Sequence, residues 1–122
     1  MIGTNDLKSS SIFYDLILKE LNMIKTFVGE RYVGYSKEDN LKKIDIYITF
    51  PYNKKPATSG NGSMIALLAK SRDQVDRFHK VALQNGALNE GFPGPRPPDA
   101  IEYYSYIRDV DGNKICVYSI EH

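Results

Sequence analysis

Tyrosine and arginine side chains alternate along residues 102–109 at a spacing that could hold a small molecule. Tyr104, Tyr106 and Arg108 lie two positions apart, and side chains at that spacing share one face of a β-strand. Tyrosine rings could contact an aromatic ligand, and an arginine could donate charge-assisted hydrogen bonds to an anionic one. The alternative is that the tyrosines are ordinary strand formers whose hydroxyls meet water. The pattern alone leaves both interpretations open.

Three further side chains are candidates for the same surface. Cys116 and Tyr118 alternate in the next predicted strand, so Tyr118 joins the other tyrosines if it shares their face. Arg96 lies in a segment rich in proline, which stiffens a loop. That segment could hold Arg96 at the mouth of a cavity, or Arg96 could be a solvated loop charge.

Neither histidine is predicted to do chemistry. His79 follows Phe78 on a predicted helix, and we expect it to be a surface or boundary residue far from the sheet. His122 is the last residue, where chain ends usually fray. No Ser-His-Asp or Cys-His motif supports a protein-based nucleophile. The sequence therefore assigns no catalytic residue.

Composition limits the class of protein. A chain of 122 residues with 42% hydrophobic and 25% charged residues fits one globular domain. Its formal net charge of +1 gives no basis for a nucleic acid or an anionic membrane as partner. No apolar run is long enough to span a membrane, and the start of the chain lacks the pattern of a signal peptide. Cys116 is the only cysteine, which excludes an internal disulfide and favours a cytoplasmic location.

The first half of the chain predicts one helix among short strands. Asp6 is a suitable N-cap for a helix that begins at Leu7 and runs to about Leu21. Ile12, Phe13, Leu16 and Ile17 recur along it at helical spacing. The predicted strands are residues 1–4, 24–29, 31–36 and 44–50.

The second half repeats this order. Residues 63–70 predict a strand, and Ser71 with Gln74 forms a capping box before a helix that stops at Gly86. Strands are then expected at residues 87–89, 102–109 and 113–120, with a loop at 91–98 and an Asp111-Gly112 turn. We therefore predict an α+β fold of two βαβββ modules, which form a cupped mixed sheet with one helix per module on its outer face. The expected boundaries are module one at 1–52, a linker at 53–62 and module two at 63–122, within a single domain.

Three segments of the sequence resemble a known family. The opening segment has Asp6-Leu7, a serine and then Phe13-Tyr14 before Leu18, and the closing segment has Asp109, then Asp111-Gly112, then Ile115. Residues 57–63 resemble the linker that enters the second module. In this order and spacing, the motifs resemble those of the vicinal oxygen chelate superfamily, which contains glyoxalases, bleomycin resistance proteins and extradiol dioxygenases. The match is to its glyoxalase-like subgroup, and it implies the fold predicted above.

The resemblance also implies a divalent metal held by His and Glu, which polarises neighbouring substrate oxygens. The first ligand position falls just before Met1, outside the sequence. The second falls in the strand at 44–50, which offers Tyr47 and Asp45, and the third and fourth are Met64 and Cys116. The usual three-ligand catalytic site is therefore not expected, and we expect that a longer N-terminus would not restore tight metal binding.

Met64 and Cys116 allow two interpretations. We expect them to face one another across the sheet, where two sulfur ligands could select copper(I) or zinc. Alternatively, both side chains fill a cavity that no longer holds a metal. The candidate cavity residues are thus Met64, Tyr104, Tyr106, Arg108, Cys116, Tyr118, Arg96 and Tyr47.

The resemblance supports two hypotheses of function. The first is a metal-free protein that binds a small organic molecule, as bleomycin resistance proteins bind without catalysis; no cofactor is then expected. The second is a metal-dependent lyase or isomerase resembling lactoylglutathione lyase, or a dioxygenase-like enzyme, which would need a divalent metal. Whether the protein is an enzyme stays open at this point. The resemblance also allows a homodimer, since this superfamily often completes its cup with a neighbouring module or chain.

Overall fold

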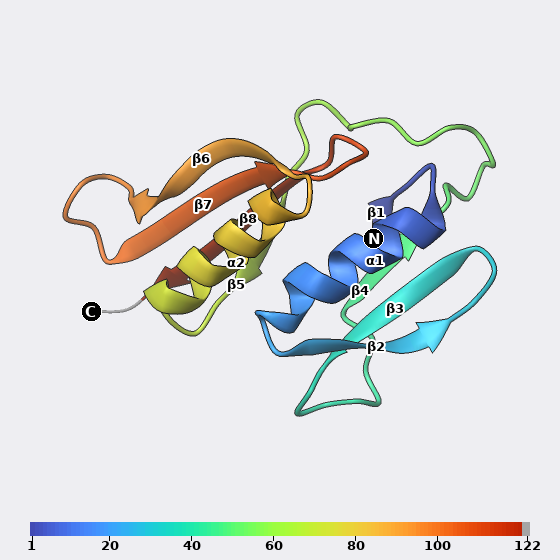
Figure 1. Ribbon diagram of the computed structural model, residues 1–122, viewed down its shortest axis with the longest axis horizontal. Coiled ribbons are helices and arrows are strands. Elements are labelled where there is room, and N and C mark those ends of the chain that lie inside the picture. Colours follow the sequence, from blue (N-terminus) through green and yellow to red (C-terminus); the bar gives the residue numbers. More distant parts are fainter. Residues whose placement is uncertain (121–122) are drawn as a thin grey trace. The chain divides into compact units, whose positions relative to one another are not determined.

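The computed structural model describes residues 1–120, which fold as two compact units (Figure 1). The first unit is Met1–Thr58, and the second begins at Ser59. Each unit contains one helix and a four-stranded sheet with both parallel and antiparallel pairs. The predicted α+β fold of two βαβββ modules is confirmed.

In the first unit the strands pair in the order β1-β4-β3-β2. β1 pairs in parallel with β4, and the other pairs are antiparallel. Helix α1 packs against β2, β3 and β4. The elements are β1 (Ile2–Gly3), α1 (Leu7–Lys19), β2 (Met23–Val28), β3 (Tyr32–Lys37) and β4 (Ile46–Thr49).

Helix α1 begins as predicted but differs in its end and its buried stripe. The Asp6 side chain accepts a hydrogen bond from the Ser9 backbone N–H at 3.0 Å, which caps the first turn. The helix ends at Lys19, before Leu21. The buried residues are Ser10, Ser11, Phe13, Tyr14, Ile17 and Leu18, whereas Ile12 and Leu16 are exposed. The buried face of α1 is therefore shifted by one residue from the face that the helical spacing of Ile12, Phe13, Leu16 and Ile17 predicted.

In the second unit the strand order is β5-β8-β7-β6, again with the first strand parallel to the last. Helix α2 packs across β6, β7 and β8 and covers one face of the sheet (Figure 1). Val75, Phe78, Ile115 and Val117 are buried in the core of this unit. The elements are β5 (Ile65–Leu68), α2 (Arg72–Gln84), β6 (Leu88–Pro95), β7 (Glu102–Arg108) and β8 (Lys114–Ile120).

The N-cap of α2 that the capping box predicted is formed by Ser71. Ser71 Oγ accepts from the Gln74 backbone N–H at 3.1 Å, as expected. The Gln74 side chain also accepts a hydrogen bond from the Lys70 backbone N–H at 2.7 Å, beyond the pair that the sequence predicted. Gly86 follows the end of the helix with a φ of 97°, as predicted for a helix stop. Within residues 1–120, neither 13-residue helix is long and apolar enough to cross a membrane.

Strand β6 corrects the prediction of a short strand at 87–89 and a loop at 91–98. The strand continues through Pro95, and its register against β7 shifts on both sides of Gly91. Proline lacks an N–H and is tolerated at sheet edges and bulges, and β6 lies at the edge of its sheet. The proline-rich segment is therefore strand over most of its length.

Candidate functional site

The register of β7 and β8 places the predicted tyrosines on one face of their sheet. Tyr104 pairs with Tyr118, and Tyr106 pairs with Cys116. The alternate residues Ile107, Ile115 and Val117 are buried in the core on the opposite face, toward α2. The face away from α2, which we call the tyrosine face, carries Tyr104, Tyr106, Arg108, Lys114, Cys116 and Tyr118.

The rings of the three tyrosines are nearly parallel. The centroids of Tyr104 and Tyr106 are 6.2 Å apart with an interplanar angle of 6°. Those of Tyr104 and Tyr118 are 5.5 Å apart at 19°. All three residues are half-buried. Aligned rings of this kind offer a planar ligand a continuous aromatic surface.

Arg96 is held beside this face. Its guanidinium donates hydrogen bonds to the carbonyl oxygens of Phe92, at 2.6 Å, and of Tyr104. Its Cζ lies 5.2 Å from the centroid of the Tyr106 ring. Gly91 makes room for this arrangement, since a Cβ there would lie 2.8 Å from Cδ2 of Tyr106. The backbone carbonyls thus fix the position of Arg96, and no carboxylate among residues 1–120 forms an ion pair with it.

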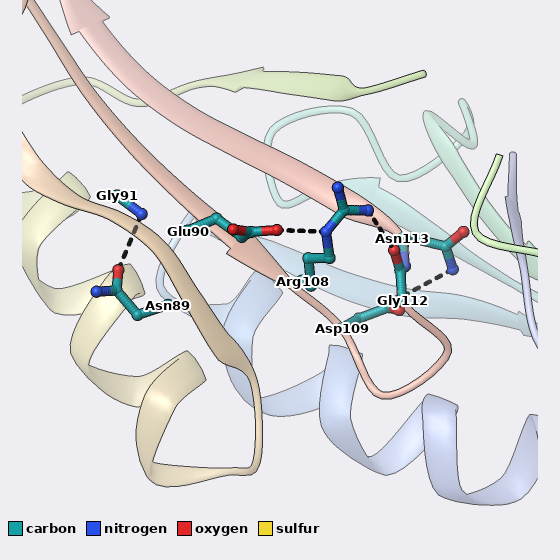
Figure 2. A network of polar contacts seen from close by, with 7 residues as sticks. All are labelled: Asn89, Glu90, Gly91, Arg108, Asp109, Gly112 and Asn113. Carbon is teal, nitrogen blue, oxygen red and sulfur yellow. Dashed lines mark hydrogen bonds and ion pairs between the residues drawn. The ribbon is translucent and has the colours of Figure 1, made fainter. Parts of the chain in front are cut away.

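Arg108, in contrast, is occupied by its own neighbours. Its guanidinium forms an ion pair with Glu90 and donates to the Gly112 carbonyl oxygen at 2.8 Å (Figure 2). The Asp109 carboxylate accepts from the Asn113 side chain in the same turn. The charge of Arg108 therefore joins β6 to the β7–β8 turn, and this residue has less to offer a ligand than the sequence predicted.

Lys114 is a candidate that the sequence analysis missed. Its Nζ lies 5.4 Å from the centroid of the Tyr106 ring. The alternation of Lys114, Cys116 and Tyr118 could have identified it by the argument used for the tyrosines. Among residues 1–120, neither Lys114 nor Arg96 forms an ion pair with a carboxylate.

Solved structures share this fold. No family model and no curated protein matches the sequence. A glyoxalase/bleomycin resistance protein from Albidiferax ferrireducens is 38% identical, with a TM-score of 0.85 over 98% of this chain and 93% of its own. The chain belongs to the glyoxalase/bleomycin resistance protein family.

Two more distant members of the family agree in fold alone. A glyoxalase/bleomycin resistance protein/dioxygenase family enzyme from Burkholderia phytofirmans is 14% identical, with a TM-score of 0.69 over 98% of this chain and 94% of its own. Lactoylglutathione lyase from Agrobacterium tumefaciens is 17% identical, with a TM-score of 0.64 over 97% of this chain and 88% of its own.

The residues at the family's metal positions do not fit a divalent metal. Met64 lies directly before β5 and is 47% exposed, whereas Cys116 is 1% exposed and pairs with Ala66, two residues after Met64 along the chain. Burial raises the pKa of the Cys116 thiol to about 11, and a thioether with one buried thiol is not the set of His and Glu donors that the resemblance implies for a divalent metal. The part of the chain that the structure describes contains no group of three His, Cys, Asp or Glu placed to hold a metal.

Tyr47 lies in the first unit, among aromatic side chains that the sequence analysis did not select. Its ring contacts Tyr32 edge-on, with 5.4 Å between centroids. Tyr32 in turn stacks on Phe27 at 5.0 Å. The register places all three on the face of their sheet away from α1. Each module thus carries an aromatic cluster on the sheet face that its helix leaves uncovered.

His79 corrects another expectation. It is 3% exposed and packs near Phe92 of β6, with 5.6 Å between the ring centroids. Within residues 1–120, neither ring nitrogen has a hydrogen-bond partner. Burial lowers the pKa of the imidazole. His79 lies on the buried stripe of α2 with Val75, Phe78 and Ala82, so it is a core residue of this unit.

A cavity of about 550 Å³ in the first unit was not predicted either. It lies between the start of α1 and the β2–β3 turn and is lined in part by Lys8, Ser11, Lys25 and Glu30. Lys25 is already satisfied there, since its Nζ lies 3.0 Å from Asp15 and donates to Ser11 Oγ at 2.7 Å. Lys25 is therefore held by groups of its own unit.

Proposed function

We propose that this chain is a metal-free member of its family that binds a small organic molecule on the tyrosine face. One observation carries the proposal. Where the resemblance places the family's metal ligands, this chain has an exposed thioether and a buried thiol, and beside them lie three aligned tyrosine rings with two cations. A face that has lost its metal donors and kept aromatic and charged groups is suited to binding without Lewis-acid chemistry.

The test combines metal analysis with ligand screening on one preparation. Protein expressed with zinc, nickel, iron and manganese should retain no stoichiometric metal by elemental mass spectrometry. A thermal-shift screen of small aromatic compounds should then find a ligand that raises the melting temperature, because a ligand that binds only the folded state stabilises it by RT ln(1 + [L]/Kd), about 2.7 kcal/mol at 100 times Kd.

A pair of variants locates the binding. Tyr104→Ala should remove most of the thermal shift, because Tyr104 is the ring that contacts both Tyr106 and Tyr118. Tyr52→Ala is the control, since Tyr52 is 97% exposed in the first unit and its loss should leave the shift unchanged. About one equivalent of retained metal, or an unchanged shift in Tyr104→Ala, would contradict the proposal.

The second candidate function is a metal-dependent lyase or isomerase resembling lactoylglutathione lyase, or a dioxygenase-like enzyme. Its support is the family fold, which many different reactions share. The lyase is tested by supplying the purified protein with nickel, zinc or iron and the adduct of methylglyoxal and glutathione. Metal-dependent conversion of the adduct would favour the lyase over the binding protein.

A further inference from the structure

The tyrosine face places two positive charges against a single aromatic ring. Arg96 Cζ and Lys114 Nζ lie 5.2 and 5.4 Å from the centroid of the Tyr106 ring. A ring attracts a cation through its negative face, so Tyr106 positions both charges without neutralising them. The groups that bind the guanidinium of Arg96 are carbonyl oxygens, which are neutral as well.

Among residues 1–120, no carboxylate forms an ion pair with either of these two cations. Glu90 is used by Arg108 in the ion pair shown in Figure 2. Glu102 lies at the start of β7, where its backbone carbonyl oxygen accepts a hydrogen bond from the Arg96 N–H at 3.3 Å. Its carboxylate forms no ion pair with Arg96 or Lys114 in the part of the chain that the structure describes. Both cations of this face can therefore pair with an anionic ligand.

The same face offers an apolar surface with a defined shape. The Tyr104 ring is nearly parallel to its two neighbours, with interplanar angles of 6° to Tyr106 and 19° to Tyr118. Flat aromatic ligands gain both burial and ring contacts on such a surface. Positively charged ligands are disfavoured because Arg96 and Lys114 repel them.

On these grounds, and resting on the proposed function of this face, we propose that its ligand is an aromatic carboxylate. The ring of the ligand contacts the three tyrosines, and its carboxylate takes the position that Arg96 and Lys114 leave without a counter-ion. The two cations provide the specificity for charge, and the tyrosines provide the specificity for a planar group.

Three probes with one ring system separate charge from shape. 2-Naphthoate, 2-naphthamide and 2-naphthylmethylamine carry charges of −1, 0 and +1 at pH 7, and their affinities for the full chain are measured by calorimetry. Naphthoate should bind about tenfold more tightly than naphthamide, and the amine should bind more weakly still. Added salt should weaken naphthoate and leave naphthamide unchanged.

Lys114→Gln tests the charge directly, because it keeps most of the side-chain length. It should reduce naphthoate affinity about tenfold and leave naphthamide affinity unchanged. Lys80→Gln is the matched control, because Lys80 is an exposed residue of α2, and this variant should behave as the wild type. Equal loss in both variants, or none in Lys114→Gln, would overturn the proposal.

The same measurements distinguish failure of this inference from failure of the proposed small-molecule-binding function. Equal affinity for the three probes, or binding of only neutral compounds in the thermal-shift screen, would overturn the aromatic carboxylate and leave a small-molecule-binding protein. Absence of binding by every probe and every screened compound would overturn both.

Discussion

Burial reduces the reactivity of the Cys116 thiol. It is 1% exposed, and burial raises the pKa of its thiol to about 11. The thiolate is the form that attacks electrophiles and binds metals, and at neutral pH this residue holds very little of it. The chain therefore has a small, largely apolar group at this position.

His79 should make the stability of the protein depend on pH. Burial lowers the pKa of its imidazole in the folded state below the ordinary value of 6.5; the nearby Asn89 side chain and Asp76 oppose this shift, and Arg96 adds to it. The unfolded chain therefore binds a proton that the folded chain does not between these two pKa values. The free energy of unfolding should fall as the pH drops from about 6.5 to the folded pKa, by about 1.4 kcal/mol for each unit between them.

Urea denaturation of the wild type and of His79→Phe at pH 7.5 and pH 5.5 checks this expectation. The variant keeps an aromatic ring near Phe92 and removes two nitrogens that lack hydrogen-bond partners within residues 1–120. It should lose less stability between the two pH values than the wild type. An equal loss would show that other groups carry the dependence.

The sequence could predict which side chains share a sheet face when they lie on the same strand. The period of two placed Tyr104 and Tyr106 on one face of β7, whereas the register between β7 and β8 was needed to place Tyr118 and Lys114 beside them. The pairing of Arg108 with Glu90 and the burial of His79 under Phe92 were not predictable in this way. Both depend on a partner from β6, a segment whose prolines indicated a loop.

At the scale of elements, order and type followed from local patterns, and boundaries depended on tertiary packing. Helix caps at Asp6 and Ser71 were visible because their hydrogen bonds are local. The extent of β6 was not visible, because β7 supplies the pairing that keeps Pro93 and Pro95 in a strand. An edge position and two register shifts are properties of the assembled sheet.

Ser71 offers a test of one such cap. Ser71→Ala should lower the free energy of unfolding by about 1 kcal/mol, because the Gln74 backbone N–H in the first turn of α2 would lose its side-chain acceptor. Thermal or urea denaturation measures the change. Ser63→Ala is a suitable control at an exposed position outside any helix or strand, and a loss as large as that of Ser71→Ala would argue against a capping effect.

The whole molecule repeats one unit twice. In both units the first strand pairs in parallel with the last, and the helix lies between the first and second strands of the chain order. Each unit buries its own apolar residues beneath its own helix. This repetition explains why motifs near both ends of the sequence were enough to predict the fold, whereas the ligand depends on side chains that differ between the repeats.

A homodimer stays a prediction at this scale, since it rests on the resemblance to the superfamily. Light scattering coupled to size-exclusion chromatography should give a mass of twice 13.8 kDa, about 28 kDa. A mass of 13.8 kDa across micromolar concentrations would favour a monomer.

The aligned rings of Tyr104, Tyr106 and Tyr118 also give the protein an intrinsic spectroscopic signal. The sequence has no tryptophan, so tyrosine dominates its ultraviolet absorption and emission. Chromophores 5.5 to 6.2 Å apart and nearly parallel couple their electronic transitions and contribute to circular dichroism near 280 nm. A ligand that binds to these rings would alter that coupling, so its binding could be followed by circular dichroism in unlabelled protein.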